Sequence, residues 1–240
     1  MSIDLNYKKK VIAFLDIMGF KNTINKTVDD TSFRENLIDC LIRLKGMENS
    51  RKSLVGVKFL EGKEVTAFSD SIVISYDLES EGSIFNILLD IIFMQIDLTA
   101  MGQILRGGVT IGDVFHGGGV VLGPAMNKAY EIESNLAIYP RIMVDPILLE
   151  YAYNNPSFGH SGEYEVKEIS RLLLPCENSY YFTNFLGMSN ELEYSYGIFM
   201  HDVKKIIDEG LKIPSIKIHN KYEWLEKYYN SVASKYKDIL

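Results

Sequence analysis

The stretch KKVIAFLDIMGF, residues 9–20, decides the fold of this 240-residue chain. Its apolar run predicts a β-strand that is buried on both faces. The run ends in one carboxylate, Asp16, before a turn at Gly19. Because an unpaired carboxylate is costly to bury, we expect a metal ion or a cationic partner beside Asp16.

A second stretch, VTAFSDSIVISYD at residues 65–77, repeats this pattern and carries Asp70 between two serines. We expect Asp70 to lie in mid-strand. Two strands that each hold one aspartate in an apolar run predict a paired-carboxylate site for Mg²⁺ or Mn²⁺, which prefer hard oxygen ligands. The carbonyl of Ile17, next to Asp16, is a further candidate ligand. Taken singly, each aspartate is also compatible with a turn-capping role.

The composition indicates a globular protein without a nucleic-acid surface. The net charge is −7, whereas phosphate backbones are bound by clustered Lys and Arg. Cys40 and Cys176 share no CxxC spacing, so we expect free thiols in a reducing compartment. The polar N-terminus predicts no signal peptide. The apolar segment 84–101 predicts no membrane span, because four polar residues interrupt it: Asn86, Asp90, Gln95 and Asp97. We therefore expect a cytoplasmic protein with no membrane or nucleic-acid partner.

Periodicity and turn residues predict an α+β sandwich, a mixed sheet with helices packed on it. The expected elements before residue 154 are a helix within 21–46 capped by Ser32, a hairpin of 54–60 and 65–76 about a turn at 61–64, a helix at 82–101, a strand at 104–116, a turn at 117–119, a helix at 125–136, a strand at 139–145 and a helix at 146–153.

Past Asn154 the periodicity weakens. We expect a strand at 180–186 and helices at 191–209 and 222–236, the last with a stripe that we interpret as core or dimer contact: Trp224, Leu225, Tyr228 and Tyr229. The chain is thus expected to divide into a core at 5–153 and an α-rich C-terminal elaboration at 154–240.

Three stretches, in order, resemble the class III nucleotide cyclases. FLDIMGF (14–20) resembles their F-x-D-I-x-G-F strand and turn, and places their first metal aspartate at Asp16. FSDSIVIS (68–75) is similar to the strand that carries their second metal aspartate, at Asp70. LRGGVTIGDVFHGGGVVLGPAMNKAYEIES (105–134) is similar to their long strand and the G-x-x-V-N-x-A-x-x-x-E-S helix, which aligns with Gly123, Asn127, Ala129, Glu133 and Ser134.

The resemblance implies a ferredoxin-like core and a homodimer with active sites at its interface. It implies that Asp16, the Ile17 carbonyl and Asp70 hold two Mn²⁺ or Mg²⁺ ions. The ribose 3′-oxygen of a nucleoside triphosphate attacks the α-phosphorus, and pyrophosphate leaves. The implied nucleotide-binding residues are Phe14, Met18, Gly19, Phe20, Thr66 and Arg106, with turn amides at 18–20 holding the triphosphate. The implied catalytic residues are Arg106, Asn127 and Lys128, with the cation supplied by the partner chain.

Three positions depart from the adenylate cyclase pattern. Thr66 stands where those enzymes carry a base-reading lysine, and Val120 stands where they carry the assisting aspartate. Glu131 replaces the arginine that stabilises their transition state. Another cation must then serve, and the candidates are Arg106, Lys128 and Arg141.

Arg106, AYEIE at 129–133 and PRI at 140–142 together resemble the pyrimidine cyclases of bacterial anti-phage defence (Pycsar). This implies that the substrate is UTP or CTP, the product cyclic UMP or cyclic CMP, and the receiver a separate cyclic-nucleotide-gated effector. Two alternatives stay open: an adenylate or guanylate cyclase, and a cyclase-like domain that binds a nucleotide or partner without turnover. Arg106, Asn127 and Lys128 also allow a solvated surface role.

Overall fold

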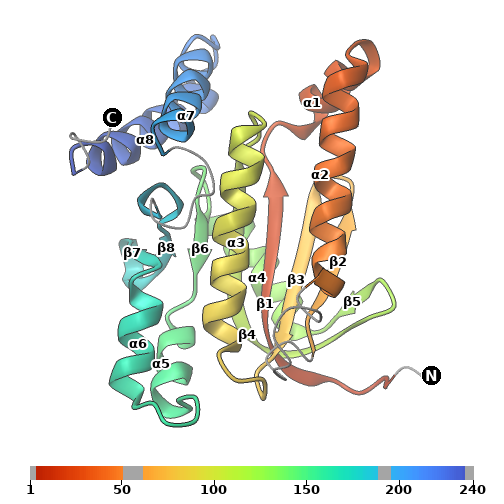
Figure 1. The fold of residues 1–240 in the computed structure, drawn as a ribbon, viewed down its shortest axis with the longest axis vertical. Helices are drawn as coiled ribbons and strands as arrows, with labels where there is room; N and C mark the ends of the chain where they lie inside the picture. Colours follow the sequence, from red (N-terminus) through yellow and green to blue (C-terminus); the bar gives the residue numbers. More distant parts are fainter. Residues whose placement is uncertain (1–3, 51–61, 189–195, 236–240) are drawn as a thin grey trace.

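The computed structural model of the protein describes residues 4–50, 62–188 and 196–235. Within these residues it holds one eight-stranded sheet with helices on it (Figure 1). The elements are β1 (Lys8–Ile17), α1 (Phe20–Asp29), α2 (Thr31–Ser50), β2 (Glu64–Phe68), β3 (Ser71–Asp77), α3 (Ser83–Ala100), β4 (Leu105–Gly117), β5 (Val120–Leu122), α4 (Pro124–Leu136), β6 (Ile142–Val144), α5 (Ile147–Asn154), α6 (Gly162–Ser170), β7 (Leu173–Pro175), β8 (Tyr181–Thr183), α7 (Tyr196–Leu211) and α8 (Ile216–Ala233).

The first predicted strand, β1, lies at the centre of the sheet. The strand order is β2-β3-β1-β4-β6-β8-β7, with β5 paired to β4 outside this row. β1 runs antiparallel to both β3 and β4, and Asp16 lies opposite Ser71 on one side and Arg106 on the other. The order β-α-β-β-α-β through β4 is the ferredoxin-like arrangement. The α+β fold class is therefore confirmed.

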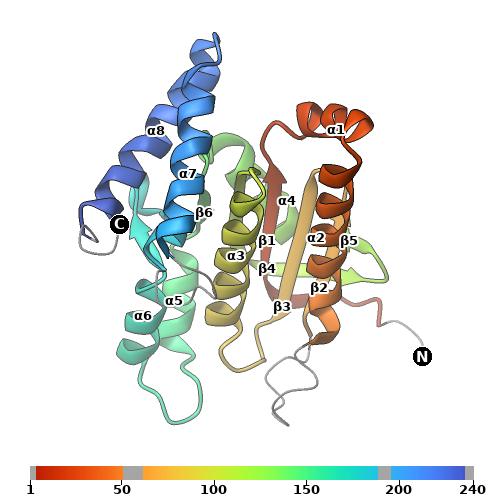
Figure 2. The same ribbon diagram turned by 45° about the horizontal axis from the view of Figure 1, so that its top comes forward.

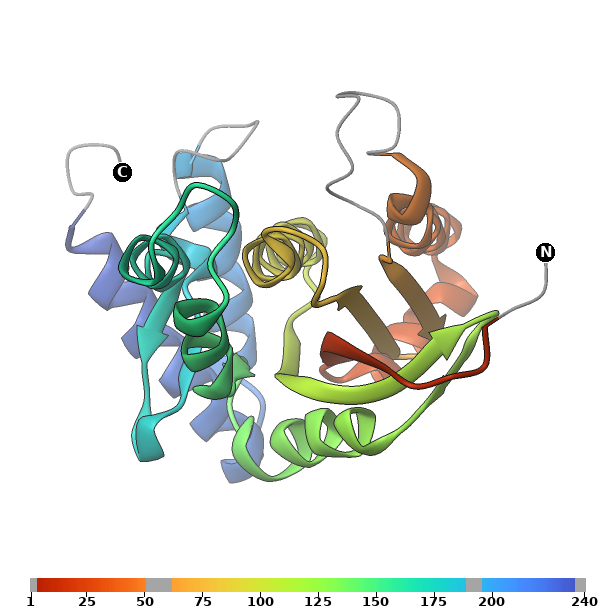
Figure 3. The same cartoon turned by 90° about the horizontal axis from the view of Figure 1, so that it is seen from below.

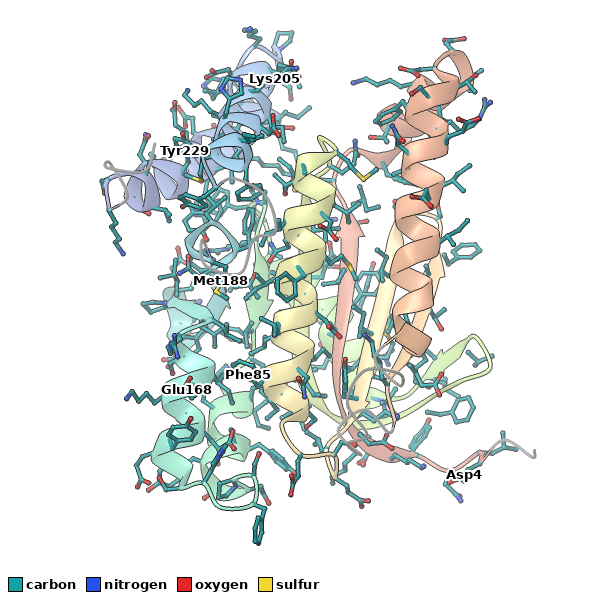
Figure 4. All side chains as sticks on the ribbon, viewed as in Figure 1. Asp4, Phe85, Glu168, Met188, Lys205 and Tyr229 are labelled. Atoms are coloured by element: carbon teal, nitrogen blue, oxygen red, sulfur yellow. The ribbon has the colours of Figure 1, made fainter. Side chains whose placement is uncertain are left out.

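Successive side chains of β1 point to opposite faces of the sheet, as the pleat requires. Val11, Ala13, Leu15 and Ile17 belong to the larger core cluster, which also contains the buried side of α3. Ile12 instead joins a smaller cluster with residues of α4. Figure 3 shows α3 and α4 on opposite faces of the sheet, and Figure 4 shows side chains filling the space between α3 and the strands.

Helix α4 lies very close to β4, and a glycine makes this possible. A Cβ at Gly108 would stand 2.4 Å from the backbone oxygen of Ala129 and 2.8 Å from side-chain atoms of Ile132. No other residue type fits there without moving the helix. The close contact brings Glu133, further along α4, against the sheet face that also carries Asp16 and Arg106.

Two expected elements differ in the structure. The helix expected within 21–46 is two helices, α1 and α2, and the cap between them is Asp30, whose Oδ1 accepts a hydrogen bond from Phe33 N at 2.8 Å. Ser32 is therefore not the cap.

The hairpin was also expected in the wrong place. Asp70 lies in the turn between β2 and β3, not in mid-strand, and Ser69 beside it has a φ of 56°. The apolar run 65–77 is thus two strands joined by a two-residue turn. The strand expected at 54–60 lies outside the described residues.

The C-terminal part continues the same sheet. β8 pairs with β6, and β7 pairs with β8; α6 and β7 were not expected from the sequence. Figure 2 shows α7 and α8 packed side by side. Leu225 and Tyr228 of the expected α8 stripe are 1% and 6% exposed, so this stripe belongs to the core.

Helix α3 is long and apolar enough to cross a membrane by length and composition, and 67% of it is buried within this structure. Its buried side packs against the sheet and α7. The helix is thus part of the protein core.

Candidate functional site

A cavity of about 350 Å³ opens where β1 ends. The end of β1 and the turn after it contribute Asp16, Met18 and Gly19 to its lining. The other lining residues come from β4, from the end of α4 and from the first turns of α8: Arg106, Ser134, Ile138, Lys217 and Lys221. Figure 1 shows the arrowhead of β1 at the top, the end at which α7 and α8 also lie.

Three charged side chains form a chain across one side of this cavity. Arg106 Nε donates a hydrogen bond to Asp16 Oδ2 at 2.9 Å, because the two residues are direct partners on β1 and β4. Arg106 Nη2 lies 2.7 Å from Glu133 Oε1, a close charge contact that lacks the angle of a hydrogen bond. The Glu133 side chain is only 3% exposed. Since a buried carboxylate needs a cation, Arg106 serves two carboxylates at once.

Two lysines of α8 bring further positive charge to the cavity. Lys217 and Lys221 form no ion pair with a carboxylate among the described residues. Burial lowers the pKa of the Lys221 ammonium, and the positive charges of Arg106 and Lys217 lower it further, while the carboxylates of Asp16 and Glu133 offset part of this effect. The cavity thus has positive charge that its own carboxylates do not neutralise.

Sequence reasoning missed both lysines. The available signal was their spacing of four residues near the start of a helix whose first turn has no acidic residue. This spacing was not recognised, because the helix was expected to begin at residue 222 and the expected helix therefore contained neither lysine.

The structure brings together the backbones of two of the three predicted metal ligands, Ile17 and Asp70. Ile17 N donates a hydrogen bond to the Asp70 carbonyl at 2.9 Å, so the β2–β3 turn rests against the end of β1. Asp70 does not line the cavity itself. Among the described residues no group of three or more His, Cys, Asp or Glu side chains is placed to hold a metal.

The donor atoms nevertheless fit a hard cation by type. Two carboxylates and the Ile17 carbonyl match the few protein ligands that Mg²⁺ takes when substrate phosphates and water supply the rest. Arg106 occupies one oxygen of Asp16, Oδ2. An ion at this site would therefore take the other oxygen.

The turn after β1 is only partly available for a phosphate. Met18 N donates to the Ile104 carbonyl at 2.8 Å, so this amide already has an acceptor. Gly19 adopts the left-handed conformation that begins α1, with φ 73°. Phe20 is 8% exposed and packs in the core. Of the expected set 18–20, only Met18 and Gly19 reach the cavity lining.

Phe14 and Thr66 lie away from this cavity. The Phe14 ring packs edge-on against Tyr130, with the centroids 5.4 Å apart. Thr66 Oγ1 is 3.0 Å from His116 Nε2, and Ser75 Oγ is 2.8 Å from His116 Nδ1. The buried imidazole of His116 thus contacts the hydroxyls of Thr66 and Ser75 on the face of the sheet that α4 covers.

This imidazole predicts a pH dependence of stability. Burial lowers the pKa of His116 to about 4, with a smaller effect from the charge of Lys10. The unfolded chain therefore binds a proton between pH 6.5 and 4 that the folded protein excludes, so stability falls as the pH drops through this range. Relative to His116→Gln, we expect the wild-type free energy of unfolding to fall by about 3 kcal/mol from pH 7 to pH 4.

Urea denaturation at several pH values measures this difference. The exposed His201 is the control, and His201→Gln should leave the wild-type pH profile in place. Identical profiles for wild type and His116→Gln would contradict the buried neutral imidazole.

The other predicted catalytic side chains lie outside the cavity of their own chain. Asn127 is exposed on α4. Lys128 Nζ pairs with Asp145 Oδ2 at 2.5 Å. Arg141 is 7% exposed and lies over the rings of Tyr139 and Trp224. Of the three candidate cations, only Arg106 lies beside Asp16 within one chain. A cation supplied by a partner chain stays a prediction.

No family model matches the chain, and no curated protein matches its sequence. Among solved structures it is similar to the catalytic core of a rhodopsin-guanylyl cyclase with converted specificity in complex with ATPαS, at 13% identity and a TM-score of 0.46, covering 74% of this chain and 97% of that chain.

Two further solved structures are similar over the same share of this chain. The monomeric guanylyl cyclase domain of the RhoGC fusion protein from the aquatic fungus Blastocladiella emersonii has 14% identity and a TM-score of 0.44, covering 74% of this chain and 95% of that chain. The adenylate/guanylate cyclase/hydrolase from Silicibacter pomeroyi has 15% identity and a TM-score of 0.41, covering 74% and 97%. At these scores the likeness does not assign an activity, so function is argued from the residues of the site.

Proposed function

We propose that this protein is a metal-dependent nucleotide cyclase that converts a nucleoside triphosphate to a cyclic monophosphate and pyrophosphate. The observation that carries the proposal is the hydrogen bond from Ile17 N to the Asp70 carbonyl. It joins two aspartate-bearing segments, 54 residues apart in the chain, beside a cavity with unneutralised positive charge. The cyclase-like motifs at 14–20 and 68–75 place their metal aspartates at these two residues.

The roles of the residues follow from their chemistry. Asp16, Asp70 and the Ile17 carbonyl would hold Mn²⁺ or Mg²⁺, which lowers the pKa of a bound hydroxyl and offsets phosphate charge. The bond from the ribose 3′-oxygen to the α-phosphorus forms, the bond from that phosphorus to the bridging oxygen breaks, and the hydroxyl proton passes to water. Arg106 is placed to offset the charge that develops on the phosphates.

We propose a pyrimidine substrate, with UTP preferred to CTP. Thr66 and Val120 are not the lysine and aspartate of the adenylate cyclase pattern, so a purine edge lacks its usual readers. Thr66 is also already hydrogen-bonded to His116. A role as second-messenger synthase in cytoplasmic anti-phage defence, with a separate effector, follows from the Pycsar resemblance.

We propose that the active form is a homodimer. Asn127 and Lys128 lie outside the cavity that holds Asp16 in the same chain, so a site containing all of them needs a second copy. Val120 and Leu122 on β5 are 55% and 60% exposed. The β4–β5 hairpin that carries them extends away from the rest of the sheet (Figure 1), which suits contact with a partner.

A non-catalytic nucleotide-binding domain is the second candidate, and one observation favours it. Arg106 occupies an oxygen of Asp16, which competes with a metal ion for that carboxylate.

Incubation of the purified chain with Mn²⁺ and ATP, GTP, CTP or UTP, with products resolved by mass, tests both candidates. We expect cyclic UMP or cyclic CMP together with pyrophosphate. Cyclic AMP or cyclic GMP would overturn the pyrimidine assignment. Nucleotide binding without any cyclic product would favour the non-catalytic candidate.

A further inference from the structure

We infer that Lys217 and Lys221 of α8 bind the polyphosphate of the substrate in the same chain that supplies Asp16. The inference rests on the proposed function for the identity of the substrate. It assigns a role to the C-terminal part of the chain, which the cyclase-like motifs at 14–134 do not reach.

The placement of the two lysines is the first argument. Both line the cavity that Asp16 and Arg106 also line, although about 110 residues separate them from Arg106 in the sequence. They are four residues apart on α8, so their side chains lie on one face of that helix. The fold of the C-terminal part therefore directs two ammonium groups to one place.

The charge balance of the cavity is the second argument. Arg106 is already paired with Asp16 and Glu133, whereas neither lysine pairs with a described carboxylate. Burial is the largest cause of the lowered pKa of Lys221, and Arg106 and Lys217 each lower it more than Asp16 or Glu133 raises it. An anion with several negative charges would relieve this repulsion.

The helix itself gains nothing from this arrangement. Like charges at positions i and i+4 destabilise a helix, and cations near a helix N-terminus oppose its dipole. α8 begins at Ile216, and its first turn contains no acidic residue that would compensate. The lysines are thus better explained by what they bind than by the stability of α8.

The cavity lining indicates which part of a nucleotide it holds. None of the described residues that line it is aromatic, so they offer no ring on which a base could stack. Compact ammonium groups on flexible stems suit phosphate oxygens. A volume of about 350 Å³ is enough for a di- or triphosphate group. The base then lies outside this cavity.

Binding of inorganic tripolyphosphate to the full chain, measured by calorimetry without metal, tests the inference. We expect the double variant Lys217→Gln/Lys221→Gln to weaken tripolyphosphate binding by about 100-fold, from about tenfold per charge-assisted contact. UTP should lose affinity similarly, whereas uridine, which has no phosphate, should bind wild type and variant alike. Lys217→Arg/Lys221→Arg keeps both charges and should retain most of the affinity.

Lys227 provides the matched control, because it is an exposed lysine on α8 that does not line the cavity. Lys227→Gln should leave tripolyphosphate binding unchanged. In turnover with Mn²⁺, the double variant should raise KM more than it lowers kcat, since phosphate contacts form before the transition state.

The inference and the proposed function fail in different ways. If wild type makes a cyclic nucleotide and the double variant keeps the wild-type KM and tripolyphosphate affinity, the lysine assignment is overturned and the cyclase stands. If tripolyphosphate binding depends on the lysines but no triphosphate is cyclised, the cyclase proposal falls and the polyphosphate site stands. Absence of tripolyphosphate binding by wild type at millimolar concentrations would overturn the inference.

Discussion

Replacement of Asp16 by asparagine is expected to reduce cyclic nucleotide formation by about a thousandfold or more, because a metal ion that loses a charged ligand loses several kcal/mol of transition-state stabilisation. Asp70→Asn should have a similar effect, since the two residues carry the only carboxylates of the proposed metal site. Asparagine has nearly the same shape as aspartate. Arg106 also keeps its contact with Glu133, so the fold should persist in the Asp16 variant.

Initial rates with Mn²⁺ measure this loss, and electron paramagnetic resonance of free Mn²⁺ measures metal binding separately from turnover. Asp113→Asn is the control, because Asp113 lies on β4 but forms an exposed ion pair with Lys9 at 3.3 Å. That variant should retain both the rate and the bound metal. A wild-type rate in either Asp16→Asn or Asp70→Asn would show that the metal site is assigned wrongly.

Arg106→Met is expected to lower the free energy of unfolding by about 3–5 kcal/mol, the usual cost of leaving a buried charge without its partner. Glu133 is the group left behind, with a side chain that is 3% exposed. Removing both charges in Arg106→Met/Glu133→Gln should restore much of the lost stability, because the most buried carboxylate is gone. The Asp16 side chain also loses Arg106, but it is 19% exposed and can be hydrated. Neither variant should support normal turnover, since both lack the Arg106 guanidinium beside Asp16.

Urea denaturation at pH 7 gives the required stabilities. Arg171→Met is the matched control: Arg171 pairs with Glu168 at 2.8 Å but is 72% exposed. Exposed pairs contribute about 0–1 kcal/mol, so this variant should remain close to wild type. If the losses of Arg106→Met and Glu133→Gln simply add in the double variant, the two side chains do not depend on each other.

The sequence predicted the centre of the fold well, because long apolar runs leave few choices. β1, α3 and β4 lie within one or two residues of their expected positions, and α4 begins at Pro124, one residue before its expected start. The turn at Asp70 could not be predicted from the apolar run in which it lies. Two-residue hairpin turns are usually recognised in a sequence by glycine or asparagine, which adopt positive φ readily. Here Ser69 adopts that conformation.

Only those residues of the candidate site that lie within local sequence motifs were predicted. Asp16 and Arg106 were both identified, yet their direct contact depends on the pairing of strands about 90 residues apart. Sequence spacing alone does not give that register. Lys217 and Lys221 were missed because their role depends on how the C-terminal helices pack. The roles of Asn127 and Lys128 stay predictions, since they depend on a second chain.

The central position of β1 also has a consequence for synthesis on the ribosome. β1 ends at residue 17, but its partner β4 is complete only at residue 117. At about 5–20 residues per second, an apolar strand waits roughly 5–20 s for that partner to be translated. Until then β1 has a neighbour on one side only, β3. The unpaired edge of this apolar strand is thus an aggregation hazard in the nascent chain, before any stability of the finished fold can act.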